Sequence, residues 1–262
     1  MIQGSSKLLK IILNKNMIRR ALIIYCNNTQ SGPLPGPAKD NENYRRFLTS
    51  LLGGEWTDAE IKSLPNPNAL RVEQMRQTHL MDADYTFIIF TGHGFINTDD
   101  NNLQYIELSD KWVSIRKLKT NAPRQTIIFD ACRGLDAFDS DEIVKSVNED
   151  LHLFSAGSPT RRLFDKAVLD ADIGVSVLYA AGINESAKDS SDGAMYLLSL
   201  LRAAEEWAKE ESEYNSLTVK GVHVRAVKYM DDHFFTLQNP TMDAEKRNRY
   251  FPFAVKIRPT LI

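Results

Sequence analysis

Apolar residues along the chain occur in short unbroken runs, and these runs alternate with segments whose apolar residues are three and four positions apart. Unbroken runs of β-favouring residues predict strands that are buried on both faces, as in a parallel sheet. Such runs occupy residues 20–25, 85–91, 125–130 and 174–181. Helical spacing predicts helices over residues 39–52, 68–82, 159–170, 193–211 and 217–230. The alternation predicts an α/β fold with a mainly parallel central sheet and helices on both faces.

Weaker patterns predict shorter elements between these. Short helices are expected at 57–64 and 109–118, a hairpin arm at 105–108, and further strands at 151–155 and 252–257. Two segments have the composition of loops. Residues 31–37 carry prolines and glycines that do not fit a helix or a central strand, and residues 135–150 are polar and acidic.

Two of the predicted strands end in polar residues that are framed by glycines. Gly92-His93-Gly94 comes directly after the strand at 85–91, and Asp130-Ala131-Cys132-Arg133-Gly134 closes the strand at 125–130. Open α/β sheets bind ligands at the carboxyl ends of their strands, where both segments would lie. Side chains alternate along a strand, so Asp130 and Cys132 are expected on one side, with His93 within reach.

A cysteine beside a histidine at such an edge suits nucleophilic catalysis. The thiolate is the reactive form of cysteine, and an imidazole removes the thiol proton and later returns it to a leaving amine. The backbone N–H groups of Gly94 and Cys132 would form an oxyanion hole, in which one donor contributes roughly 3 kcal/mol. The sequence therefore predicts His93 and Cys132 as a catalytic dyad, and Cys26 as a buried structural cysteine.

Composition and charge narrow the class of protein. The 262-residue chain has a net charge of −2, which provides no attraction to nucleic acid or membranes, and no apolar run is long enough to span a bilayer. Cys26 and Cys132 do not make a disulfide scaffold or a metal site, so a reducing, cytoplasmic setting is expected. We expect one domain over 18–262 and an extension at 1–17, unless Met17 is the start.

Several other catalytic or binding motifs are excluded, because the sequence lacks residues that they require. A phosphatase loop needs arginine six positions after the cysteine, where the chain has Phe138. Residues 92–97 lack the third glycine of a dinucleotide fingerprint, and the chain has no Walker loop, His-Glu-x-x-His helix or nucleophile elbow. A nucleophilic cysteine is the chemistry that the residues favour.

The two motifs together resemble those of a known family. Thr91-Gly92-His93-Gly94, followed by Asp130-Ala131-Cys132-Arg133-Gly134, is similar to the His-Gly and Cys blocks of caspase-like cysteine proteases. Aspartate two positions before the cysteine is typical of metacaspases, orthocaspases and paracaspases. The similarity extends over roughly residues 20–202. It implies a caspase-like sandwich and a cysteine endopeptidase that needs no cofactor and acts through a thioacyl-enzyme.

The resemblance also implies how the substrate is recognised. In members specific for basic residues, the aspartate before the cysteine and one in the first helix line an acidic S1 pocket, and here these are Asp130 and Asp40. Two carboxylates suit the guanidinium of arginine or the ammonium of lysine. Glu185 stands in for the Asp-x-Gln motif of metacaspases, which is absent here, and is expected as a third S1 residue. A neutral P1 residue is the alternative.

Partners and biological role are expectations from the resemblance alone. Small stand-alone bacterial members cut a protein partner, such as a gasdermin-like pore former, in antiviral defence or cell death. Two copies would form a homodimer through the last strands, at 251–257. A catalytically silent scaffold that binds partners through the same cleft is the alternative to an enzyme.

Two further expectations concern the loop after the cysteine and its surroundings. The run of acidic residues in this loop is interpreted as part of a solvated loop. The alternative is a calcium site of the kind that some metacaspases use. The run consists of Asp136, Asp139, Asp141 and Glu142. If P1 is basic, Lys145, Arg161 and Arg162 are candidate self-cleavage points.

Overall fold

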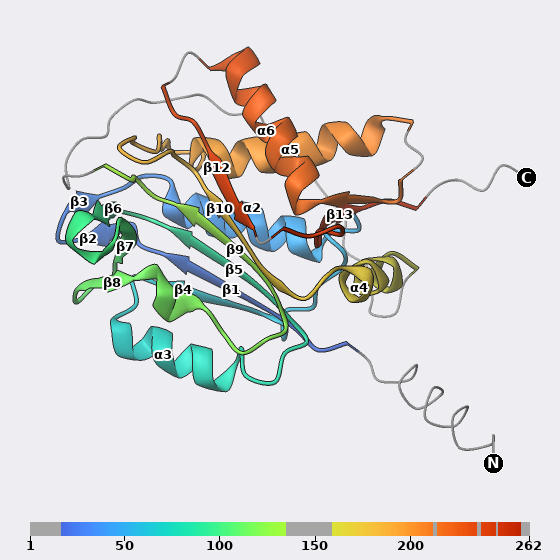
Figure 1. The fold of residues 1–262 in the computed structure, drawn as a ribbon, viewed down its shortest axis with the longest axis horizontal. Helices are drawn as coiled ribbons and strands as arrows, with labels where there is room; N and C mark the ends of the chain where they lie inside the picture. Colours follow the sequence, from blue (N-terminus) through green and yellow to red (C-terminus); the bar gives the residue numbers. More distant parts are fainter. Residues whose placement is uncertain (1–16, 135–158, 212–213, 235–236, 245, 258–262) are drawn as a thin grey trace, which may run out of the picture.

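A six-stranded sheet runs through the centre of the computed structural model, which describes residues 17–134, 159–211, 214–234, 237–244 and 246–257 (Figure 1). The parallel strands are β1 (Arg19–Tyr25), β4 (Ile61–Pro65), β5 (Tyr85–Thr91), β9 (Arg124–Asp130) and β10 (Gly174–Tyr179). One edge strand, β12 (Thr241–Ala244), lies antiparallel to β10. The order is β12-β10-β9-β5-β1-β4, so the predicted α/β fold with a mainly parallel sheet is confirmed.

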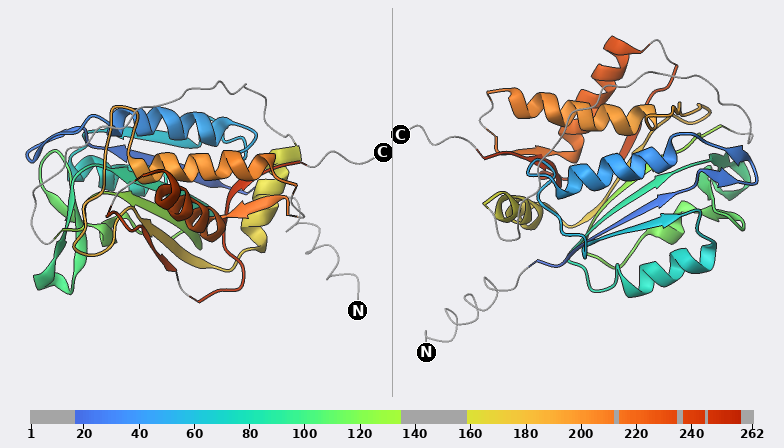
Figure 2. Two further views of the ribbon diagram at one scale, coloured as in Figure 1. Left: turned by 90° about the horizontal axis from the view of Figure 1, so that it is seen from above. Right: turned by 180° about the vertical axis from the view of Figure 1, so that it is seen from behind.

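Helices cover both faces of this sheet (Figure 1, Figure 2). One face carries α2 (Pro37–Thr49), α4 (Pro159–Asp170), α5 (Met195–Lys209), α6 (Val219–His233) and the paired strands β11 (Ser216–Thr218) and β13 (Pro252–Val255). The other face carries α3 (Ala69–Thr78) and the short helix η2 (Ile115–Leu118). None of the helices described here is both long and apolar enough to cross a bilayer.

Smaller elements lie beside the sheet. A three-stranded sheet consists of β6 (Gly94–Asn97), β7 (Leu103–Glu107) and β8 (Trp112–Ser114). A short hairpin consists of β2 (Asn28–Thr29) and β3 (Gly32–Pro33), and η1 (Thr98–Asp100) is a single turn. The hairpin and the small sheet follow the carboxyl ends of β1 and β5, so they border the edge where the predicted dyad lies.

Side-chain alternation along β9 divides the hydrophobic core into two clusters. Ile128 belongs to the cluster beneath α2, α4, α5 and α6, and Cys132 packs against this same cluster. Ile127 and Phe129 belong to the cluster on the side of α3. Asp130 accepts a hydrogen bond from the backbone of α5, so it lies on the same side as Cys132. The expected alternation through this segment is confirmed.

The helix expected at 57–64 is wrong, because these residues lead into β4. β4 pairs in parallel with β1, from Ala21 opposite Ile61 to Tyr25 opposite Pro65. A spacing of three between the buried Ile61 and Leu64 fits one face of a helix equally well. Only a strand, however, supplies hydrogen-bond partners to the free edge of β1.

Pairing with strands distant in the sequence also determines the secondary structure of two other segments. The helix expected at 109–118 is wrong, because Trp112–Ser114 pair with β7 and only η2 is helical. β12 was not predicted, since this edge strand is half-buried or exposed throughout and shows no apolar alternation.

The helix cap predicted at Asn68 is confirmed, because its side chain accepts a hydrogen bond from Arg71 N at 2.8 Å. The strand expected at 151–155 lies outside the described residues.

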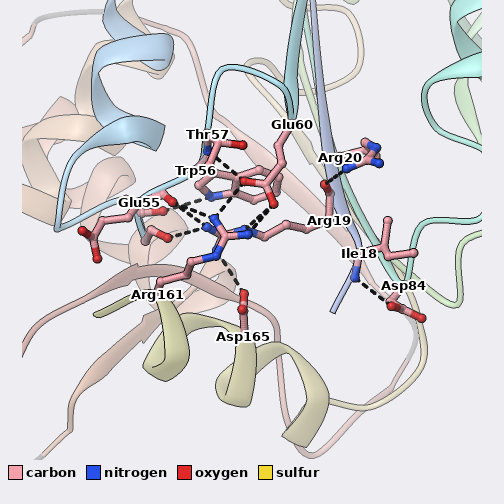
Figure 3. A network of polar contacts seen from close by, with 12 residues as sticks. Ile18, Arg19, Arg20, Glu55, Trp56, Thr57, Glu60, Asp84, Arg161 and Asp165 are labelled. Atoms are coloured by element: carbon pink, nitrogen blue, oxygen red, sulfur yellow. Dashed lines mark hydrogen bonds and ion pairs between the residues drawn. The ribbon is translucent and has the colours of Figure 1, made fainter. Parts of the chain in front are cut away.

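Arg19 of β1 forms contacts that hold α4 against the first strand of the sheet (Figure 3). Its guanidinium is fully buried, lies 4.6 Å from the centroid of the Trp56 ring, and pairs with Asp165 at 3.1 Å and Glu60 at 3.5 Å. Burial lowers the pKa of Arg19 to about 10, although both carboxylates oppose this shift. Arg161 of α4 adds a second ion pair to Glu60, at 2.5 Å. The network therefore holds the first turns of α4 against β1.

Two of the candidate self-cleavage points lie inside this helix. Arg161 and Arg162 are residues of α4, whereas proteases nick exposed loop tips in preference to folded helices. The third candidate, Lys145, and the acidic run between 136 and 142 lie outside the described residues. Cleavage at Arg161 or Arg162 would thus require α4 to unfold first.

Candidate active site

A pocket opens at the carboxyl edge of the sheet, where β5 and β9 end. The two strands pair with Thr91 opposite Asp130, so His93 and Cys132, each two residues farther along, leave the sheet at the same level. The pocket is lined by Leu34, Pro37, Thr91, Gly92, His93, Asp130, Ala131, Cys132, Ala187, Lys188, Asp189 and Ala194. The structure therefore brings the thiol and the imidazole to one cavity.

The short hairpin of β2 and β3 anchors the imidazole of His93. The ring atom Nε2 is hydrogen-bonded to the carbonyl oxygen of Gly32 at 3.2 Å. A carbonyl oxygen only accepts, so Nε2 carries a proton and Nδ1 is the basic atom of the neutral ring. Gly92 makes the bend before the histidine with φ of +155°, and a Cβ there would lie 3.0 Å from the Cβ of Cys26. The contribution of Gly32 was not predicted from the sequence.

The thiol of Cys132 contacts the backbone of the loop after β10. Its Sγ donates a hydrogen bond to the carbonyl oxygen of Ala187 at 3.7 Å. Burial raises the pKa of the Cys132 thiol above its ordinary value, while hydrogen bonds with Ala187 and Ser186 oppose the shift and the nearby Asp130 adds to it. The cysteine therefore needs a base to become a nucleophile, and His93 is the base that shares its pocket.

The backbone N–H of Gly94 points away from β7. Gly94 lies opposite Ile106, and Glu107 N donates to the carbonyl oxygen of His93 at 3.0 Å. Ladder bonds that flank a residue pair in this way make it a non-hydrogen-bonded pair. The N–H of Gly94 is therefore free of β7 and directed to the opposite side of β6.

That opposite side of β6 faces the segment that contains the cysteine. Ile96, two residues along, donates its N–H to the carbonyl oxygen of Gly134 at 3.0 Å. A Cβ at Gly94 would lie 2.7 Å from the Cβ of Ala131 and 3.0 Å from the carbonyl oxygen of Cys132. Glycine at position 94 is thus required for this close approach. The arrangement directs the Gly94 N–H toward the residues around Cys132.

Asp130 and Asp40 are buried carboxyl groups at the base of the pocket, 3% and 1% exposed. Asp40 accepts hydrogen bonds from Thr91 Oγ1 at 2.8 Å and Ala194 N at 2.9 Å, so it lies behind two lining residues. Asp130 accepts from Leu197 N at 3.3 Å and lines the pocket itself. Burial raises the pKa of Asp40 to about 8 and that of Asp130 well above its ordinary value, with Asp40 adding to the second shift.

A third carboxylate, Asp189, lines the pocket and was not predicted from the sequence. It accepts hydrogen bonds from Gly36 N and Ser190 N, each at 2.9 Å. Burial raises its pKa, while these hydrogen bonds and the nearby His93 oppose the shift. A Cβ at Gly36 would lie 1.8 Å from Asp189 Oδ1, so only glycine fits there. The sole sequence signal was an acidic residue four positions after Glu185.

The structure does not bring Glu185 into the lining of the pocket. Its carboxylate accepts hydrogen bonds from Asn239 N at 2.8 Å, Asn239 Nδ2 at 2.7 Å and Gly182 N at 2.9 Å. These contacts brace the loop after β10 against the residues before β12. Within the described parts of the chain, no group of three or more His, Cys, Asp or Glu side chains has the arrangement of a metal site.

Comparisons with known proteins agree with the fold. A family model described as the caspase domain, of the C14 peptidases, matches residues 18–251. The structure is similar to the crystal structure of caspase-1 from Spodoptera frugiperda, with a TM-score of 0.61 and 15% identity over 93% of this chain and 94% of that chain. At that identity the likeness shows the fold alone. No curated protein matches the sequence. With the family model spanning most of its length, the chain belongs to the caspase domain family of cysteine peptidases.

Proposed function

We propose that this protein is a cysteine endopeptidase that cleaves a protein partner after arginine or lysine. The observation that carries the proposal is a single pocket lined by the Cys132 thiol, the His93 imidazole and the carboxyl groups of Asp130 and Asp189. A nucleophile, its base and an acidic recognition site then lie within the reach of one substrate residue.

The catalytic cycle follows from the protonation states of the two reacting groups. The Cys132 proton passes to Nδ1 of His93 as the sulfur attacks the scissile carbonyl carbon. The N–H groups of Gly94 and Cys132 donate hydrogen bonds to the oxyanion that forms. The imidazolium then protonates the leaving amine, which departs and leaves a thioester on Cys132. Water, deprotonated by His93, attacks the thioester, and the thiol takes back its proton as the acid product leaves.

The acidic side of the pocket supports a basic P1 residue. A guanidinium that enters between Asp130 and Asp189 would form charge-assisted hydrogen bonds with both carboxylates, and Asp40 adds negative charge behind the wall. Arginine suits such a planar, bidentate site, and lysine contacts it as a point charge. Leu34 contributes an apolar surface for the aliphatic part of either side chain.

A panel of peptides that differ only at P1 tests this proposal. The peptides carry arginine, lysine, citrulline, leucine or aspartate, and citrulline has the shape of arginine without its charge. We expect kcat/KM for arginine to exceed that for citrulline by about 100-fold, because unpaired buried carboxyl groups reject the neutral analogue. Equal rates for arginine, lysine and leucine would contradict a basic P1. Absence of both hydrolysis and labelling by a thiol-reactive active-site reagent would favour the scaffold.

Cleavage after arginine is expected to become more efficient as the pH rises from about 6 to about 8, relative to cleavage after citrulline. Burial raises the pKa of Asp40 to about 8, so this carboxyl is largely protonated below that pH. A bound guanidinium favours the ionised form, so binding releases a proton and tightens with pH between the bound and free pKa values. The ratio of the two kcat/KM values, measured at each pH, should rise in the wild type and rise less in Asp40→Asn, where only Asp130 and Asp189 retain raised pKa values.

The same raised pKa predicts a change of stability that needs no substrate. The folded protein binds the Asp40 proton more tightly than the unfolded chain does, so this group lowers stability as pH rises from about 4 to about 8. Asp40→Asn removes the effect and keeps the acceptor for Ala194 N. The melting temperature of Asp40→Asn minus that of the wild type should therefore be larger at pH 8 than at pH 5. A constant difference between the two proteins would contradict an ionisation at Asp40.

The resemblance extends the proposal to a biological role. A gasdermin-like pore former in bacterial antiviral defence is a partner of the proposed kind, provided that an exposed segment of it carries arginine or lysine. We propose a cytoplasmic site of action. The strand expected at 252–257 forms β13, which already pairs with β11. We therefore propose that two copies pair through β12, because its outer edge has no neighbour in the described sheet.

A further inference from the structure

A buried glutamate outside the pocket, Glu107, contacts the hairpin that anchors the histidine. It is the last residue of β7 and 1% exposed. Its carboxylate accepts hydrogen bonds from Thr29 Oγ1 at 2.6 Å and from Ser31 N at 3.2 Å. Both donors belong to the tip of the β2–β3 hairpin, next to Gly32, whose carbonyl oxygen accepts the proton of His93 Nε2.

Glu107 also contacts His93 directly through the main chain. Its N–H donates to the carbonyl oxygen of His93 at 3.0 Å. One residue thus holds the backbone of the histidine and, through its side chain, the group that orients the imidazole ring. A carboxylate is costly to bury unless it is well hydrogen-bonded, and an apolar side chain would fill the same space without that cost. The hydrogen bonds to the hairpin therefore explain why a carboxylate occupies this buried position.

The carbonyl of Gly32 depends on such support. Gly32 has φ of +116°, a backbone conformation in which the direction of the carbonyl is set by the hairpin and not by a regular strand. The charge-assisted bonds to Thr29 and Ser31 fix the end of β2 and the two-residue turn that leads to Gly32. Without them the acceptor for His93 Nε2 would lose its position.

We propose that Glu107 is a positioning residue for His93, which acts by holding the Gly32 carbonyl where it keeps the proton on Nε2 and the base on Nδ1. The inference rests on the proposed role of His93 as the base for Cys132. Misplacement of a catalytic group by about 1 Å costs about 100-fold in rate, so a residue of this kind has a measurable effect without touching substrate.

The test measures how fast iodoacetamide alkylates Cys132 at each pH, followed by mass spectrometry of the Cys132 peptide. Cys26 serves as the internal reference for loss of structure, because it is fully buried and iodoacetamide reaches it only when the fold opens. We expect Glu107→Ala to slow alkylation near neutral pH by about tenfold, as His93→Ala does, because the base is misplaced. The rates should converge at high pH, where the thiol ionises without a base.

Three further variants separate positioning from general loss of structure. Glu107→Gln keeps an acceptor oxygen and should restore alkylation to within about threefold of the wild type. Thr29→Val removes one bond and should act in the same direction as Glu107→Ala, even if the latter fails to fold. Asn66→Gly is the matched control, because Asn66 holds the base of the hairpin through Asn28 N at 3.0 Å and already has a positive φ. It should lower the melting temperature without changing the alkylation profile.

Peptide hydrolysis distinguishes failure of this inference from failure of the proposed function. In an active enzyme, Glu107→Ala should lower kcat about 10- to 100-fold and leave KM nearly unchanged. Wild-type alkylation profiles in both Glu107→Ala and Thr29→Val would overturn the positioning role while leaving the peptidase intact. Alkylation that depends on His93 and Glu107 in a protein that cleaves no peptide would support the positioning role and overturn the proposed function.

Discussion

Cys132→Ala is expected to lower kcat/KM for an arginine peptide by about 10,000-fold or more, to the background of the assay. The variant keeps the pocket but has no atom that forms the thioester. His93→Ala should lose a comparable factor, because burial raises the pKa of the thiol and His93 supplies the imidazole in the described pocket lining. Residues of a dyad act as one unit, so the double variant should be no slower than either single one.

Matched controls use the chain's other cysteine and an exposed histidine. Cys26→Ala removes a buried thiol that does not line the pocket, and His233→Ala removes an exposed imidazole at the end of α6. Both should retain activity within about threefold of the wild type, as substitutions away from a site usually do. Hydrolysis that survives in Cys132→Ala but is lost in Cys26→Ala would contradict the assignment of the nucleophile.

Asp189→Asn is expected to lower kcat/KM for arginine peptides by about 100-fold, which corresponds to about 3 kcal/mol. The change removes a negative charge from the pocket lining but keeps an acceptor for Gly36 N. A charged P1 side chain therefore loses its partner, whereas the citrulline peptide loses little. The measurement is kcat/KM for the two peptides with both proteins, and their ratio isolates the charge.

Glu185→Gln is the control that separates the two acidic residues of the same loop. Glu185 bonds to Asn239 and Gly182 and does not line the pocket, so its neutralisation should leave the preference for arginine over citrulline within about threefold. An arginine preference that is lost in Glu185→Gln and kept in Asp189→Asn would show that Glu185 is the residue that recognises P1. Melting temperatures of both variants exclude loss of folded protein as the cause.

The shared position of His93 and Cys132 was predictable because the sequence signals for it are local. Buried strands are unbroken apolar runs, and a polar residue framed by glycines at the end of such a run, as at His93 and Cys132, marks the ligand-binding edge of a parallel sheet. The neighbourhood of the two residues then follows from sheet topology, since β5 and β9 are adjacent and in register. Periodicity failed where two structures fit one pattern, as it did at residues 57–64.

The residues that the sequence did not reveal act through partners far away along the chain. Asp189 reaches the pocket beside Gly36, 153 positions before it, and Glu107 holds Thr29 across 78 positions. No local pattern records such a contact, because loops have no period and their course depends on the elements that carry them. Glu185 and Asp189 are acidic residues of the same loop. Because the loop bends between them, Asp189 lines the pocket and Glu185 bonds to Asn239.

By itself, the sequence determined the α/β architecture and the candidate pair His93 and Cys132, because both follow from local runs of residue types. The tertiary structure decided the rest of the site: which carboxyl groups line the pocket, which carbonyl orients the imidazole, and which of these groups hold protons. Those properties depend on burial and on contacts between segments distant along the chain: burial, together with the nearby Asp189, raises the pKa of Asp40 to about 8. An aspartate on the surface is charged at neutral pH, whereas burial in the fold raises the pKa of Asp130 well above its ordinary value.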